Sequence, residues 1–127
     1  MTPEVPAVLM QLAQIVARNA APGVPEGERA SDLGLTTALL GVAAEIWDSA
    51  AQNLVEENRA LRALLDEPGA DEDFRISALK AVNDVLRAKL IAAHVAAEQA
   101  GDTARQDAIW AELVASTERR KLSTSLV

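Results

Sequence analysis

Two polar residues occupy positions in a helical repeat that otherwise carries apolar side chains. In the stretch NLVEENRALRALL, Glu57 and Asn58 interrupt a seven-residue repeat of apolar residues. A carboxylate and an amide on an apolar helix face need hydrogen-bond partners, because burial without them is costly. The sequence offers three: Asn83 is the polar member of a second apolar repeat, and Arg119 and Arg120 end the last helical segment.

These five residues allow two interpretations. In the first, Glu57, Asn58, Asn83 and an arginine form a buried site that contacts a ligand or a partner. In the second, they form a hydrogen-bonded layer that fixes helix register, as a single asparagine does in a coiled coil. The second is favoured, since a glutamate beside a seam can also turn its carboxylate towards water.

A second group of side chains joins both tryptophans to the only histidine, namely Trp47, His94 and Trp110. Many alanines flank these residues in the sequence. Small neighbours can leave a hydrophobic pocket with an imidazole at its edge, which predicts a ligand site. They can equally make room for two large rings in a packed core, and this interpretation is favoured.

Familiar catalytic and metal-binding patterns are missing from the sequence. A di-iron helical bundle needs two Glu-x-x-His pairs, but Ile91 stands three residues before His94 and no second histidine exists. Glu57 with Asp84 would give magnesium only two carboxylates, a weak signal. No phosphate loop, nucleophile elbow or zinc pattern occurs. The sequence therefore predicts no cofactor and no metal, and it leans against an enzyme.

Composition narrows the class further. The chain has 127 residues, which suits one domain, and a net charge of −7, which disfavours nucleic acid and membrane surfaces as partners. It has no cysteine, and nine arginines against three lysines with 26 alanines suggest a bacterial source. The apolar residues 5–17 lack the basic start of a signal peptide, and no stretch is apolar enough to cross a membrane. We expect a cytoplasmic protein.

The elements that must position these side chains are all helices. Apolar periodicity and turn residues predict helices at about 4–20, 31–66, 73–100 and 103–121. Gly101 is placed to end the third helix, and Thr103 with Gln106 forms a capping-box pattern at the start of the fourth. The fold predicted is an all-α antiparallel four-helix bundle with a long central hairpin.

Short connections make sequential helices antiparallel, so residues at one height have numbers with a constant sum. We take a sum of about 140 for the second and third helices and about 203 for the third and fourth. This map places Asn58 level with Asn83, near Arg119 and Arg120. It also places Trp47, His94 and Trp110 together.

The shorter outer helices leave the tip of the predicted hairpin uncovered. An exposed apolar patch of this size normally marks an interface, which predicts a two-fold homodimer. The alternative cover is the C-terminal tail, through Leu122, Leu126 and Val127. The function predicted is a non-enzymatic helical protein that acts through protein–protein interaction, and the alternative is a bundle that binds or transforms a small molecule. The predicted interface residues are Leu61, Leu64, Leu65, Phe74, Ile76 and Leu79.

Overall fold

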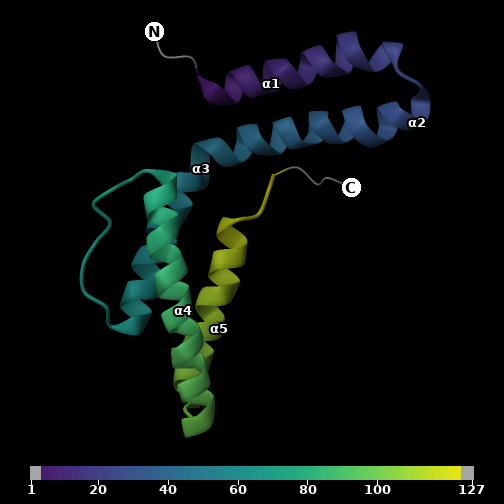
Figure 1. Ribbon diagram of the computed structural model, residues 1–127. Coiled ribbons are helices and arrows are strands. Elements are labelled where there is room, and N and C mark those ends of the chain that lie inside the picture. Colours follow the sequence, from purple (N-terminus) through teal and green to yellow (C-terminus); the bar gives the residue numbers. More distant parts are fainter. Residues whose placement is uncertain (1–3, 124–127) are drawn as a thin grey trace. The chain divides into compact units, whose positions relative to one another are not determined.

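A computed structural model describes residues 4–123 (Figure 1). Within this range every regular element is helical, which confirms the all-α prediction. None of the helices described is long and apolar enough to cross a membrane. The α-helices are α1 (Val5–Ile15), α2 (Glu26–Glu28), α3 (Gly34–Leu65), α4 (Ile76–Ala100) and α5 (Thr103–Arg119), with π-helical turns at Val16–Ala20 and Arg29–Leu33 and a 3-10 turn at Ala21–Gly23.

The chain divides into two compact units, whereas its length suggested one domain. Among the described residues, unit 1 takes those up to Ser49 together with Leu122 and Ser123, and unit 2 is Ala50–Lys121. The long helix α3 contributes its first part to unit 1 and its second part to unit 2. Because the division falls within a helix, no turn or linker composition signals it.

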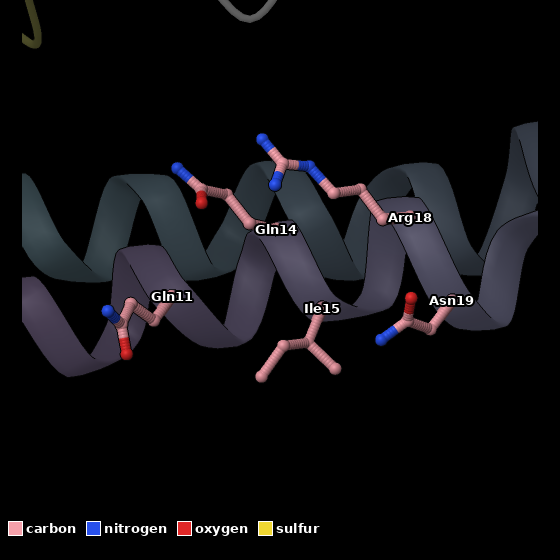
Figure 2. A pocket seen from close by; sticks show the side chains of 5 residues that line it. All are labelled: Gln11, Gln14, Ile15, Arg18 and Asn19. Atoms are coloured by element: carbon pink, nitrogen blue, oxygen red, sulfur yellow. The ribbon is translucent and has the colours of Figure 1, made fainter.

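Unit 1 is built on a helical hairpin. Helix α1 begins with a proline in its first turn, where the missing N–H costs nothing, and its backbone then widens into the π-helical turn. Figures 1 and 2 show α1 running alongside the first part of α3. Among the described residues of this unit, the buried apolar side chains are Ala13 and Ala44. Two alanines make a very small core.

Unit 2 packs the second part of α3 against α4 and α5. Its apolar centre consists of Leu61, Leu86, Leu90 and Ile109. Gly101 ends α4 with a left-handed φ of 66°, as predicted. The N-cap of α5 is Asp102, whose carboxylate accepts from the backbone N–H of Arg105 at 3.0 Å, rather than the predicted Thr103.

Helices α4 and α5 are antiparallel, in the predicted register. The side chain of Gln106 donates to the carbonyl of Ala97 at 3.3 Å, which gives a sum of 106 + 97 = 203. The rings of His94 and Trp110 also meet, with 94 + 110 = 204. This part of the height map agrees with the structure.

Helices α3 and α4 are parallel, so the predicted central antiparallel hairpin is wrong. Figure 1 shows the second part of α3 and α4 running in the same direction. Leu61 of α3 packs in one cluster with Leu86 and Leu90 of α4, whereas a sum of 140 would place it level with Leu79. Figure 1 shows the connecting segment 66–75 climbing back beside α3 before α4 begins.

The physical reason is the extended form of that connection. Ten residues separate Leu65 from Ile76, and in extended form they reach roughly 33 Å, the length of about 20 helical residues. Asp66 ends α3 with a positive φ of 55°, and Asp71 then pairs with Arg62 at 2.8 Å, which holds the segment against the helix. We refer to residues 66–75 as the return segment.

Candidate functional site

The polar residues singled out in the sequence lie in the interior of unit 2. Glu57 and Asn58 of α3 are 2% and 0% exposed, and Asn83 of α4 is 3% exposed. They face inward because they occupy the same helical stripes as the core leucines of α3 and α4. We call Glu57, Asn58 and Asn83, with the side chains bonded to them, the polar cluster.

The two asparagines join α3 to α4. The amide nitrogen of Asn83 donates to the Asn58 carbonyl oxygen at 3.0 Å. The amide nitrogen of Asn58 in turn donates to the backbone carbonyl of Leu79 at 3.2 Å and to both carboxylate oxygens of Asp71 at 3.3 Å. Asn58 therefore holds together α3, α4 and the return segment.

Glu57 is the other centre of the cluster. Its carboxylate accepts from Arg87 of α4 at 2.5 Å, from Arg120 at the end of α5 at 2.6 Å, and from the Ser116 hydroxyl at 3.1 Å. Both arginines are partly exposed, with side-chain exposures of 38% and 51%. One buried carboxylate thus ties α3 to α4 and α5.

The surroundings of Glu57 keep it ionised. Burial raises the pKa of its carboxyl group, but hydrogen bonds from Asn83, Arg120 and Ser116, with the positive charge of Arg120, lower that pKa by more. The result is a pKa below the ordinary value of 4.5. A carboxylate held in this way is a poor proton acceptor at neutral pH, so the site does not suit general base catalysis.

The structure separates the two arginines that the sequence offered as partners. Arg120 bonds Glu57, whereas Arg119 pairs with Glu112 on the same helix, and its backbone carbonyl accepts from Asn53 at 3.1 Å. Sequence reasoning missed three members of the cluster. They are Asp71, Arg87 and Ser116.

Only one of these omissions had a signal in the sequence. Arg87 follows Asn83 by four residues, which places it on the same side of α4 as the seam asparagine. Asp71 belongs to a segment that was interpreted as a simple acidic turn, and nothing in its composition indicated a return along α3. Ser116 resembles any other small polar residue on a helix.

The residues Trp47, His94 and Trp110 are divided between the two units. The rings of His94 and Trp110 meet edge to face, with centroids 5.9 Å apart and planes at 88°. Trp47 belongs to unit 1 and is 54% exposed. The ring contact that the structure shows is therefore that of His94 with Trp110, within unit 2.

The residues predicted as a dimer interface fall into two groups. Leu61 and Leu79 are 2% and 0% exposed, and Leu64 and Leu65 pack partly buried against the core, so these four are structural. Leu86 and Leu90 of α4 and Ile109 of α5 form the cluster that covers this end of α3. Phe74 and Ile76 remain 63% and 42% exposed. Of the alternative tail residues, Leu122 is half-buried and assigned to unit 1, while Leu126 and Val127 lie outside the described residues.

Large apolar side chains are exposed in both units, seven of them in unit 2 and eight in unit 1, where the buried apolar residues described are two alanines. Large apolar side chains there are between 44% and 58% exposed, and they come from both helices of the hairpin. They are Val8, Met10, Leu12 and Ile15 of α1 and Leu35, Leu39, Ile46 and Trp47 of α3.

Unit 1 also has a shallow hollow of about 260 Å³ on α1 and the turn that follows it. Figure 2 shows Gln11 and Asn19 on either side of Ile15, while Gln14 and Arg18 extend in the opposite direction in this view. Since all five side chains come from one short stretch of helix, this hollow is a surface feature of α1 and suggests no chemistry.

Comparisons with protein-family models, with curated proteins and with solved structures found no match for this chain. Within residues 4–123, no group of three or more histidine or acidic side chains is arranged to hold a metal ion.

Proposed function

We propose that this protein is a non-enzymatic helical interaction protein that pairs with a second copy of itself through the hairpin of unit 1. One observation carries the proposal: eight large apolar side chains of the hairpin are about half exposed, whereas the buried apolar residues described there are two alanines. Where exposed apolar side chains gather into a patch, the patch normally marks an interface. The sequence also predicted a homodimer, but it placed the contact at the tip of the central hairpin and not on unit 1.

The charge distribution favours a second copy of the chain as the partner that covers the apolar surface of the hairpin. Residues 5–17 and 33–44 contain no ionisable side chain, although the chain as a whole carries a net charge of −7. Two copies repel each other over most of their surfaces, but these two segments bring no charge into a contact. In a two-fold pairing these neutral segments face themselves, so they bring no desolvated or like-charge pair into the contact.

The energy available is of the right size but leaves little margin. Burying a large apolar side chain fully contributes about 1.5–3 kcal/mol, so completing the burial of a half-exposed one contributes about 1 kcal/mol. Eight such side chains in each of two copies give roughly 16 kcal/mol, against an association cost of about 4–15 kcal/mol. Pairing is therefore favourable only if it covers most of the apolar surface of the hairpin.

Sedimentation velocity over a range of protein concentrations tests the proposal. We expect a dimer for the natural chain and a monomer for Leu39→Glu, because the substitution places a charge in the interface twice. Ile91→Glu is the matched control, since Ile91 is 68% exposed but lies on α4 in unit 2. A natural chain that sediments as a monomer at high concentration refutes the proposal, and dissociation by Ile91→Glu alone would assign the interface to unit 2.

A further inference from the structure

A small pocket lies beside the polar cluster, and we propose that it binds a small monocarboxylate. It has a volume of about 220 Å³, all its residues belong to unit 2, and it is independent of the pairing proposed for unit 1. Its lining consists of Leu54, Lys80, Asn83, Asp84, Arg87 and Arg120.

The charges around the pocket do not balance. Lys80 pairs with Asp84 at 2.7 Å, while Arg87 and Arg120 share the single carboxylate of Glu57. Three positive charges against two negative charges leave a net charge of +1. This local excess occurs in a chain whose overall charge is −7, so it is not a consequence of composition.

The two arginines retain donors for a ligand. A guanidinium has five N–H donors in a planar fork, and Glu57 engages one nitrogen of Arg87 and one of Arg120. Their side chains are 38% and 51% exposed, so both reach the pocket from the buried carboxylate. Because Glu57 anchors both of them, the guanidinium groups are held in position before a ligand arrives, which lowers the entropy cost of binding.

Charge selects a carboxylate in preference to a phosphate. One carboxylate neutralises the excess of +1 and matches the planar arginine fork. A phosphate carries about −1.5 to −2 at neutral pH and would leave excess negative charge beside Glu57 and Asp84. Leu54 offers an apolar contact, which suits a short alkyl chain attached to the carboxylate.

A titration of the full chain with sodium butyrate, followed by amide chemical shifts at constant ionic strength, tests this assignment. We expect saturable shifts at the α4 amides of Lys80, Asp84 and Arg87, with weaker responses to sodium phosphate and to sodium chloride. Equal responses to butyrate and chloride, or tighter binding of phosphate, would overturn the carboxylate assignment.

Two variants locate the site. Lys80→Gln is expected to weaken butyrate binding about three- to fivefold, since Lys80 makes an exposed charge contact. Lys89→Gln is the matched control, because Lys89 is also on α4 but pairs with Glu67 outside the pocket. Arg120→Gln is expected to weaken binding about tenfold or more. If Arg120→Gln does not fold, the comparison of Lys80→Gln with Lys89→Gln still tests the site. Equal butyrate affinities of these two variants would reject the pocket as the binding site.

Discussion

Neutralising Glu57 removes the only negative charge that Arg87 and Arg120 share. Glu57→Gln keeps the size of the side chain and one acceptor oxygen, so the change is mainly one of charge. Charge-assisted hydrogen bonds contribute about 1.5–3 kcal/mol and neutral ones about 0.5–1.5 kcal/mol, so weakening two of them costs roughly 3 kcal/mol. Both arginines are partly exposed and can turn to water, which puts the loss at the lower end of the roughly 3–5 kcal/mol for breaking a buried pair.

Urea denaturation at neutral pH and fixed protein concentration measures this loss directly. Glu56→Gln is the matched control, because Glu56 is the neighbouring carboxylate and bonds the exposed Gln52. We expect the control to change the unfolding free energy by less than about 0.5 kcal/mol. A loss below about 1 kcal/mol for Glu57→Gln would mean that the shared carboxylate does not hold the three helices, and the account of the polar cluster would be rejected.

The stability difference between the natural chain and Glu57→Gln depends on pH, and the direction of that dependence follows from the lowered pKa of Glu57. Since the pKa of Glu57 is lower in the folded chain than its ordinary value of 4.5, its ionisation stabilises the fold fully above about pH 4.5. That stabilisation is lost as the pH falls through the folded-state pKa. The difference in stability between the natural chain and Glu57→Gln should therefore be constant from pH 6 to 8 and shrink below about pH 4.5.

Three further substitutions test the return segment and the helix geometry, each by urea denaturation. Asp71→Ala should cost about 3 kcal/mol, because its side chain is 4% exposed and its loss leaves Asn58 and Arg62 without their carboxylate partner; an unchanged stability would show that the segment is not anchored there. Gly101→Ala should cost about 1 kcal/mol, since an alanine is strained at a φ of 66°. Gly41→Ala should instead stabilise by about 0.5–1 kcal/mol, because Gly41 is inside α3 and a new Cβ meets nothing within 4 Å; a loss there would indicate a close contact from a second copy.

Helix positions were predictable because their signals are local. The apolar repeats of α3 and α4 and the turn residues between them fix helix type over long stretches, and Gly101 marks one helix end through its own conformational freedom. The α4–α5 register was predictable for the same reason, since two residues, Gly101 and Asp102, separate the helices and leave no alternative to an antiparallel turn.

Helix direction across the return segment was not predictable in this way. Ten residues can either close a wide antiparallel turn or extend along a helix, and the choice depends on tertiary contacts of Asp71 with Arg62 and Asn58. Those contacts join residues whose chemical types are common on any helix surface. The sequence pattern is therefore compatible with both parallel and antiparallel packing of α4 on α3, and only the tertiary contacts distinguish the two.

The pairing of Asn58 with Asn83 was nevertheless anticipated, and the geometry explains why. An antiparallel register with a sum of 140 and a parallel register with a difference of 25 intersect close to this height, so both bring these two residues together. Residues away from this height have different partners in the two registers, so their contacts show which register the structure has. Leu61 is one of them, since it packs in one cluster with Leu86 and Leu90, whereas a sum of 140 would place it level with Leu79.

The two units differ in what specifies their packing. In unit 2 a buried carboxylate and two buried amides connect three helices, and any shift in register would leave these groups without partners at a cost of about 1–3 kcal/mol each. The described apolar surface of the unit 1 hairpin carries no comparable buried group, and residues 5–17 and 33–44 lack charge altogether. Apolar contacts are non-directional, so they supply association energy without selecting one register. If the hairpins pair as proposed, the alignment of the two copies must depend on the shape of the side chains, and substitutions that preserve hydrophobicity but change shape should alter the dimer more than they alter unit 2.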